Sequence, residues 1–272
     1  WAINKIFSEY GLEKGKEIVA AKKRGGTHVR TNGLIYSDEK FERDLENAGY
    51  KFEKTKTGYY VSMNPLLKKL FIEGRITYQS LTSTYAALAL DVKDGQNVLD
   101  VCSAPGGKAI FVAEKKPKAN VVACDIHPHR VELIGAYARR MHVKNVMPTL
   151  FDGTAFNKEW AGHFDRVLCD VPCSAMGVVK KQPDVLLNRS ESDIAALKKV
   201  QYSILDNAKN YVKSGGLLVY STCTIFKEEN DDNVEEFLKN NNDFEKYPSE
   251  FDGQYLPCDT HDGFFIRRLR RK

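Results

Sequence analysis

The segment from residue 97 to residue 113 constrains the fold most, because it reads as a strand, a glycine turn and a helix. Val98, Leu99 and Val101 form a short apolar run suited to a buried strand. Residues 104–107 read Ala-Pro-Gly-Gly, and residues 108–113 favour a helix. A strand that leads through glycines into a helix is how doubly wound α/β sheets present backbone N–H groups to a ligand. The segment therefore predicts a largely parallel sheet with helices packed on it.

The composition of this turn narrows the class of ligand. It lacks the three spaced glycines of a dinucleotide site, and Lys108 is followed by Ala109 instead of the Ser or Thr of a phosphate-binding loop. Gly106 and Gly107 lack a Cβ, so a cofactor and the backbone can approach closely. A ligand with an amino-acid end and a nucleoside end fits best, and S-adenosylmethionine is such a ligand. A tight turn that binds nothing remains the alternative.

The remaining chain predicts two modules. Its 272 residues suffice for an α/β core and a smaller module. We expect a small α/β module at 1–75, with a first helix that ends at Gly11, a strand at 28–32 and a helix capped by Ser37. A catalytic domain should follow at 76–272. Its expected strands are 97–101, 120–125, 145–151, 164–169, 217–221 and 263–269, and its later helices are 131–141, 191–213 and 228–239.

Composition and charge exclude some classes of protein. Hydrophobic residues make up 42% of the chain and charged residues 28%, which is typical of soluble globular proteins, and no apolar run reaches the roughly 18 residues of a membrane span. A net charge of +5 does not by itself indicate nucleic-acid binding. Basic side chains do cluster, and the clusters leave a solvated face and an RNA or DNA surface both open. They are Lys22-Lys23-Arg24 with Arg30, Arg139-Arg140 with Lys144, Lys180-Lys181, and Arg267-Arg268 with Arg270-Arg271-Lys272.

The cysteine and histidine patterns do not predict a metal site. The six cysteines contain no CxxC pair, and without a secretory signal they should be reduced thiols of a cytoplasmic protein, most of them inert in the core. His127-Pro128-His129 lacks a third ligand at metal spacing and favours the start of a helix, with Pro128 in its first turn.

Two aspartates follow successive predicted strands behind the glycine turn. Asp125 ends the second strand, where a carboxylate can accept both ribose hydroxyls, and Asp152 follows the third, within reach of an adenine edge. Either aspartate alone could equally be a helix cap. Together they indicate a nucleoside cofactor.

Two cysteines follow the next two predicted strands. Cys173 lies in Asp170-Val171-Pro172-Cys173-Ser174, and Cys223 lies in the run from Tyr220 to Thr224. The strand order usual for this topology makes these strands neighbours, so both thiols should face one cleft. This arrangement suits methylation at carbon 5 of a pyrimidine, in which a thiolate adds to carbon 6 and makes carbon 5 nucleophilic. A carboxylic acid near ring nitrogen 3 would stabilise the developing charge, and a base must later remove the carbon 5 proton.

With these motifs the chain resembles the Nop/Sun family of RNA 5-methylcytosine methyltransferases over nearly its whole length. The matching pieces are residues 102–108, 170–174, 215–224 with 228–230, and 262–265. The resemblance implies a class I S-adenosylmethionine-dependent methyltransferase fold, Rossmann-like, with a mostly parallel seven-stranded sheet. We expect the small N-terminal module to be RRM-like and to bind RNA along its basic edge; a packing module that binds no ligand is the alternative.

The resemblance assigns roles to the site residues. It implies that Cys223 is the nucleophile, that Cys173 assists release of the product, and that Asp170 contacts the target cytosine near the methyl donor. DNA cytosine methyltransferases place the nucleophile in a Pro-Cys motif, which makes Cys173 the alternative nucleophile. The implied cofactor-binding residues are Cys102, Ser103, Ala104, Pro105, Gly106, Gly107, Lys108, Asp125, Asp152 and Asp170.

The departures from the family pattern are small. Ser103 and Val171 replace alanines, and Gln79-Ser80 stands where the family often has Gln-Asp, so no carboxylate role is expected there. Residues 177–184 and the opening from Trp1 look most like the bacterial Sun branch, which acts on 16S ribosomal RNA. That branch carries an upstream NusB-like RNA-binding domain, and a first residue other than Met predicts that something precedes it here. We expect a monomer; a tRNA methyltransferase and a non-catalytic RNA-binding assembly factor are the alternatives.

Overall fold

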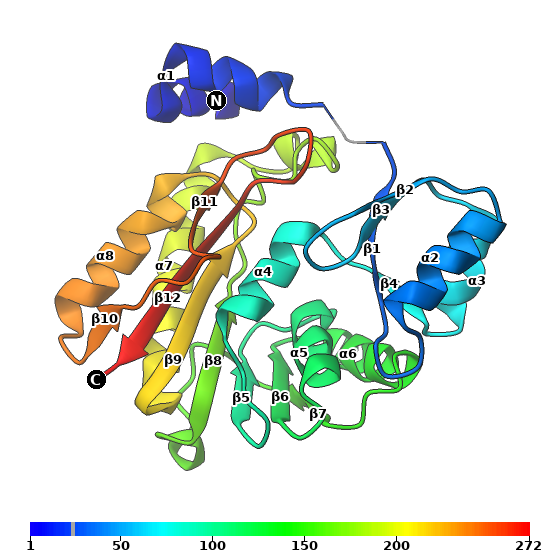
Figure 1. The fold of residues 1–272 in the computed structure, drawn as a ribbon. Coiled ribbons are helices and arrows are strands. Elements are labelled where there is room, and N and C mark those ends of the chain that lie inside the picture. Colours follow the sequence, from blue (N-terminus) through cyan, green and yellow to red (C-terminus); the bar gives the residue numbers. More distant parts are fainter. Residues whose placement is uncertain (23–24) are drawn as a thin grey trace.

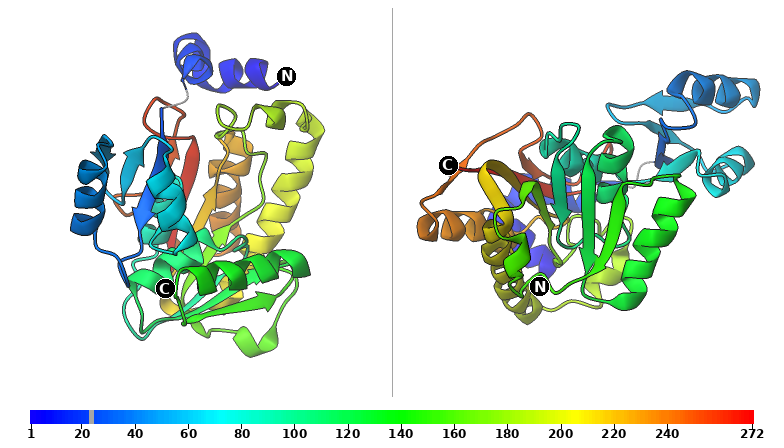
Figure 2. Two further views of the ribbon diagram at one scale, coloured as in Figure 1. Left: turned by 90° about the vertical axis from the view of Figure 1, so that its right-hand side faces the viewer. Right: turned by 90° about the horizontal axis from the view of Figure 1, so that it is seen from below.

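The computed structural model describes residues 1–22 and 25–272 and contains two β-sheets (Figure 1). Figure 2 shows the smaller sheet and its two helices as a lobe beside the larger one. The elements up to the end of the smaller sheet are α1 (Ala2–Ala20), β1 (Thr27–Thr31), α2 (Asp38–Asn47), β2 (Phe52–Lys54), β3 (Tyr59–Val61), α3 (Pro65–Ile72) and β4 (Ile76–Tyr78).

The smaller sheet is antiparallel, with the strand order β2-β3-β1-β4. Its core joins β1, α2 and β3 through Val29, Phe41 and Tyr59, all fully buried. Ser37 caps α2 as predicted, because its side chain accepts a hydrogen bond from the Lys40 N–H at 3.3 Å. Strand β4 belongs to this sheet, so the sheet extends past residue 75. The division of the chain at residue 75 stays a prediction.

The larger sheet confirms the predicted α/β class. Seven strands follow the order β10-β12-β9-β8-β5-β6-β7, and β11 pairs with β12. The five strands from β9 to β7 are parallel, whereas β10, β11 and β12 are antiparallel to their neighbours. The strands are β5 (Asn97–Asp100), β6 (Asn120–Asp125), β7 (Val146–Leu150), β8 (Phe164–Asp170), β9 (Val212–Thr222), β10 (Phe244–Lys246), β11 (Gly253–Tyr255) and β12 (Phe264–Arg271).

Helices cover both faces of this sheet, and each face has its own core. Alternate residues of a strand point to opposite faces, so Val98 packs with α4, α5 and α6, whereas Leu99 packs with α7 and α8. The helices are α4 (Leu81–Ala89), α5 (Gly107–Lys115), α6 (Pro128–Arg140), α7 (Glu191–Ala208) and α8 (Asp231–Asn240). The result is a three-layer α/β/α arrangement whose parallel strands all present their carboxyl ends at one edge.

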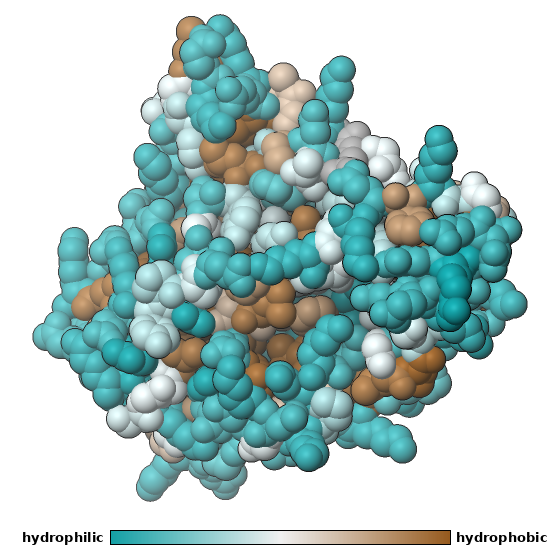
Figure 3. Space-filling model, viewed as in Figure 1, coloured by the Kyte–Doolittle hydropathy of each residue, from teal (hydrophilic) through white to brown (hydrophobic). Residues whose placement is uncertain are grey.

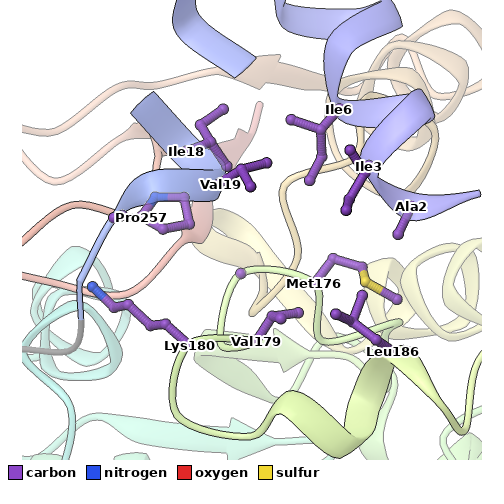
Figure 4. Close-up of a pocket in the computed structure, with 12 residues that line it drawn as sticks. Ala2, Ile3, Ile6, Ile18, Val19, Met176, Val179, Lys180, Leu186 and Pro257 are labelled. Atoms are coloured by element: carbon purple, nitrogen blue, oxygen red, sulfur yellow. The ribbon is translucent and has the colours of Figure 1, made fainter. Parts of the chain in front are cut away.

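Helix α1 is divided at Gly11, where the sequence predicts that the first helix ends. Gly11 has non-helical backbone angles, with φ 73° and ψ 175°, and a second helical segment follows it to Ala20. Its apolar side packs against Met176 and Phe226 of the larger domain, and an apolar groove remains between them (Figure 4). Figure 3 shows hydrophobic surface gathered beneath this helix on an otherwise mostly hydrophilic face. Thus α1 shares its hydrophobic cluster with the larger domain.

Among the described residues, no helix combines the length and apolar character that crossing a membrane requires.

Candidate active site

The two predicted cysteines lie opposite each other at the ends of β8 and β9. These strands are parallel neighbours, and Asp170 pairs in register with Ser221. Each cysteine follows its strand within three residues, and the two Sγ atoms are 3.3 Å apart. Cys173 is buried with 8% of its surface exposed, while Cys223 is half-buried. The structure therefore brings both thiols to one place and leaves Cys223 the more accessible.

A buried polar network joins the two loops that carry these cysteines. The hydroxyl groups of Ser174 and Thr224, the residues directly after the cysteines, are 2.8 Å apart. The Glu229 carboxylate accepts hydrogen bonds from the Ser174 N–H at 2.8 Å and from its hydroxyl at 2.5 Å. Gln201 donates to Glu229 and to the Pro172 carbonyl, at 2.9 Å each. Glu229 and Gln201 were not among the predicted site residues, although Glu229 lies in the 228–230 piece that matches the family.

The surroundings of Cys173 raise the pKa of its thiol. The hydrogen bond with Cys223 raises the pKa of Cys173, burial adds to the rise, and the charge of Glu229 acts in the same direction. Cys173 is therefore held as a neutral thiol. Burial likewise raises the pKa of Cys102, Cys124 and Cys169, which makes them poor nucleophiles.

Asp170 is fixed through both carboxylate oxygens. Ser221 donates its hydroxyl to Oδ1 at 2.7 Å, and Lys108 donates its ammonium group to Oδ2. Burial acts to lower the pKa of Lys108, but the carboxylates of Asp170 and Asp100 outweigh it, so the net shift is upward. Lys108 thus stays charged and orients Asp170, which ends β8 beside the thiols.

The glycine turn has the geometry expected of a ligand cradle. Gly106 adopts a left-handed conformation with φ 107°, and its N–H donates to the Ser103 carbonyl at 2.7 Å. A Cβ added to Gly106 would lie 3.3 Å from the Ile134 side chain. Pro105 lies within the turn, and α5 begins at Gly107. The turn thus leads directly into the N-terminus of a helix.

Buried polar groups with unused hydrogen-bonding capacity gather at this turn. The amide nitrogen of Gln79 has no partner among the described residues, and Asp100 and Ser103 have none outside the turn itself. Burial raises the pKa of Asp100 to about 7 against the opposing charge of Lys108. Unpaired buried polar groups are costly unless a ligand satisfies them. The turn therefore fits the amino-acid end of S-adenosylmethionine.

The two aspartates at the next strand ends also interact with residues close to them in the sequence. Asp125 is 4% exposed, accepts from the His127 N–H at 3.1 Å and lies 3.2 Å from the Arg130 guanidinium. Asp152 accepts from the N–H and hydroxyl of Thr154 at 2.9 and 2.7 Å. Both follow strands whose carboxyl ends lie at the same edge as the glycine turn. Their capping contacts and their predicted cofactor roles are compatible.

The histidine pair near this edge lies at the start of a helix with Pro128 in its first turn, as the sequence predicts. Pro128 is the first residue of α6, and His127 directly precedes it. In the described ranges 1–22 and 25–272, no group of three or more His, Cys, Asp or Glu residues is arranged to hold a metal ion.

Several predicted basic clusters are paired within the chain. On β12, Arg267 pairs with Asp231, Arg270 with Glu245 and Arg271 with Asp243. Lys180 and Lys181 both face Asp262. Arg139 and Lys144 are exposed. Lys22 is exposed too, whereas Lys23 and Arg24 of the first cluster lie outside the described residues.

Comparisons with known proteins show which family and which solved fold this chain is similar to. The model of one family, described as 16S rRNA methyltransferase RsmB/F, matches residues 87–270. The chain is 32% identical to ribosomal RNA small subunit methyltransferase B of Pasteurella multocida over its full length and covers 64% of that protein. It is 38% identical to the probable ribosomal RNA small subunit methyltransferase B of Bacillus subtilis, a match that covers 74% of this chain and 49% of the relative. A solved methyltransferase homologue from Pyrococcus horikoshii superposes with a TM-score of 0.84 at 26% identity and covers 99% of this chain and 94% of that one.

Proposed function

This chain belongs to the RsmB/F family of 16S rRNA methyltransferases, and from that premise we propose that it methylates carbon 5 of a cytosine in RNA with S-adenosylmethionine as donor. The chain spans 64% of the length of the Pasteurella relative, so the activity of the whole protein is part of the proposal. The observation that supports it most is the pair of thiols 3.3 Å apart beside Asp170 and the glycine turn.

In the proposed mechanism, Cys223 supplies the nucleophile. Its thiolate adds to carbon 6 of the cytosine, so that an S–C6 bond forms and the electron pair of the C5=C6 bond becomes available at carbon 5. Bound at the glycine turn, S-adenosylmethionine would supply the methyl group to carbon 5 and leave as S-adenosylhomocysteine. A base would then take the carbon 5 proton, so that the C5=C6 double bond forms again as the S–C6 bond breaks and Cys223 leaves as a thiolate.

Asp170 and Cys173 would support the two halves of this cycle. Asp170, held by Lys108 and Ser221, would bind the cytosine ring near nitrogen 3 and stabilise the charge that develops on addition. Cys173 lies against Cys223 and would assist release of the methylated product. Cys223 is the more accessible of the two thiols, which favours it as the group that adds to carbon 6.

The residues proposed to hold the cofactor line one sheet edge. The turn from Cys102 to Lys108 would bind the amino-acid end, Asp125 the ribose and Asp152 the adenine. The buried polar groups with unused hydrogen-bonding capacity at the turn support the first assignment. Asp125 would exchange its contact with Arg130 for the ribose hydroxyls.

The RNA-facing assignments also remain proposals. We propose 16S ribosomal RNA as substrate, because the family model and the curated relatives carry that name. The 1–75 module would bind RNA in a cytoplasmic monomer. Exposed Arg139 and Lys144 are available to phosphates.

Replacing each cysteine separately tests the mechanism. Cys223→Ala should abolish transfer of a tritiated methyl group to 16S RNA. Cys173→Ala should instead accumulate an enzyme–RNA adduct that survives denaturing electrophoresis, because the S–C6 bond forms but is not resolved. Cys258→Ala changes a half-buried cysteine that has no part in the proposed mechanism, so it serves as the control and should retain activity. Activity in both site variants would overturn the covalent mechanism.

The same variants identify the nucleophile and the RNA. An adduct with Cys223→Ala and none with Cys173→Ala would reverse the two roles. Bisulfite sequencing of 16S RNA and tRNA, from cells with and without the protein, would locate the methylated cytosine. Methylation confined to tRNA would contradict the proposed substrate, and binding of RNA without any methylation would indicate an assembly factor.

A further inference from the structure

We propose that Gln79 and the N-terminus of α5 form a binding site for the carboxylate of the cofactor's methionyl end, and that Arg30 from the smaller sheet positions the Gln79 amide. The inference rests on the proposed function, because it requires S-adenosylmethionine at the glycine turn. It adds a cofactor contact outside the predicted site residues and makes the N-terminal lobe part of the cofactor site.

The orientation of the Gln79 amide is fixed by its contacts. Its side-chain oxygen accepts a hydrogen bond from Arg30 Nε at 2.7 Å, deep in the protein, and only 9% of the residue is exposed. Its backbone is held by His28, whose Nδ1 lies 2.7 Å from the Gln79 carbonyl oxygen. Because Arg30 can only donate, the amide oxygen must face it. The amide nitrogen therefore faces the opposite way.

That amide nitrogen has no acceptor among the described residues. It faces the start of α5: a Cβ added to Gly107 would lie 3.5 Å from Gln79 Nε2. A buried N–H₂ group without an acceptor costs free energy in the folded protein. Such a group persists where a ligand supplies the missing oxygen.

The N-terminus of α5 contributes further donors at the same place. The first helical hydrogen bond of this nine-residue helix runs from the Ile110 N–H to the Gly106 carbonyl at 2.9 Å. The N–H groups of residues 107–109, in the first turn of this helix, have no acceptor in the described chain. These N–H groups carry the positive end of the helix dipole and attract an anion. The carboxylate is the anionic group of S-adenosylmethionine, and it matches these donors.

Arg30 connects this site to the smaller sheet. It lies on β1, is 2% exposed, forms a buried ion pair with Glu114 of α5 and stacks 4.9 Å from the Phe111 ring. Glu114 also accepts from the Gly33 N–H at 3.0 Å. Arg30 is therefore anchored to α5 on one side and to Gln79 on the other. It acts as a positioning residue for the amide.

Two ligands that differ only in the carboxylate test the proposal. S-adenosylmethionine and decarboxylated S-adenosylmethionine would be titrated into the protein without RNA, by calorimetry. Gln79→Met keeps the side-chain length and removes the donor. It should therefore lower the affinity for S-adenosylmethionine by about 10- to 100-fold, the range for a hydrogen bond to a charged group. It should change the affinity for the decarboxylated ligand less than about twofold. Gln79→Glu should weaken S-adenosylmethionine more, because it places like charges together.

Arg30→Lys tests the positioning role. It keeps a cation against Glu114 but loses the Nε donor to Gln79, so it should give a smaller loss that is again specific for the carboxylate. Gln96→Met is the matched control, because Gln96 lies on the loop before β5 and contacts the Lys93 N–H. Circular dichroism would verify that each variant is folded.

The outcomes distinguish failure of this inference from failure of the proposed function. Equal weakening of both ligands by Gln79→Met, or no weakening of either, would overturn the carboxylate site while leaving the methyltransferase proposal intact. A folded wild-type protein that binds neither ligand would overturn both. A carboxylate-specific loss in Gln79→Met but not in Arg30→Lys would retain Gln79 and remove Arg30.

Discussion

Glu229 is a fully buried carboxylate that holds the chain on both sides of the two thiols. Its oxygens accept hydrogen bonds from Ser174 and Gln201, and the Ser174 hydroxyl forms a hydrogen bond with the Thr224 hydroxyl. The distance between the thiols is thus set by groups one residue away from each. A buried carboxylate satisfied by several donors is expensive to disturb, which suits a site whose reacting atoms need fixed spacing.

His28 gives a pH-dependent stability that can be measured. Burial lowers its pKa to about 4, the charges of Lys181 and Arg30 act in the same direction, and the Gln79 carbonyl opposes them. His28 binds a proton near pH 6.5 in the unfolded chain and near pH 4 in the folded chain. Its contribution to the free energy of unfolding is therefore complete above pH 6.5 and is lost as the pH falls toward 4. Between pH 7 and 5 the loss should be about 2 kcal/mol.

Urea unfolding at both pH values checks this expectation. His28→Gln should remove that part of the pH dependence, whereas His129→Gln, at an exposed histidine, should retain it. An unchanged pH dependence in His28→Gln would show that the histidine is not the group responsible.

Sequence reasoning located the cysteines but not the groups that hold them. Cys173 and Cys223 could be placed together because the usual strand order of an α/β sheet makes β8 and β9 neighbours. The contacts of Glu229 with Ser174 and of Gln79 with Arg30 join residues 55 and 49 positions apart. They depend on how loops and lobes pack, and no local pattern encodes that.

The strands were easier to predict than the ends of the helices. β6 begins and ends where expected, because its apolar run is bounded by polar residues. Helix α7 was expected to reach residue 213, but it ends at Ala208. Tyr211 and Val212 are both fully buried, so they extend the apolar spacing of the helix although Val212 already belongs to β9. A buried turn between two elements cannot be recognised from that spacing.

A glycine contact between loops supports the active-site strand ends. The Gly177 N–H donates to the Cys223 carbonyl at 2.9 Å, and the Gly263 N–H donates to the Gly177 carbonyl at 2.8 Å. A Cβ on Gly177 would lie 2.3 Å from the Gly263 carbonyl oxygen. Because both neighbours are backbone, the loops must move to accept a side chain.

Gly177→Ala should therefore displace Cys223 without removing any side chain of the site. We expect a loss of methyl transfer of more than about tenfold and a fall in the free energy of unfolding of about 1–3 kcal/mol. Tritium transfer and urea unfolding measure the two effects. Gly25→Ala, whose Cβ would meet nothing within 4 Å, is the control. Full activity in Gly177→Ala would contradict the role of this loop contact.

Helix α1 packs against the segment that follows Cys223. Ile6 is 8% exposed and packs in the cluster that contains Ile225 and Phe226, which closely follow Cys223. Tyr10 donates its hydroxyl to the Ile225 carbonyl. Sequence reasoning grouped this helix with the small module, because the chain connects them. Its partners lie more than 150 residues away.

Ile6→Asp should detach α1 and loosen the segment after Cys223. Burying an unpaired carboxylate in place of an isoleucine should cost about 2–4 kcal/mol of α1 docking. Hydrogen exchange at residues 225–226 should become faster, and methyl transfer should fall. Leu12→Asp, at a residue of the same helix that is 61% exposed, should change neither. Unaltered exchange in Ile6→Asp would show that α1 does not stabilise this segment.

The polar contacts between the two lobes have a consequence for any RNA that binds. Tyr60 donates to the Thr260 carbonyl at 2.6 Å, and Arg140 of α6 donates to the carbonyls of Phe71 and Ile76 at 2.9 and 3.1 Å. With the buried pair of Arg30 and Glu114, these contacts tie the lobes together at several separate points. Under the proposed function, a substrate strand would meet a preassembled surface, and the work of turning a base outward to reach sulfur would fall on the nucleic acid.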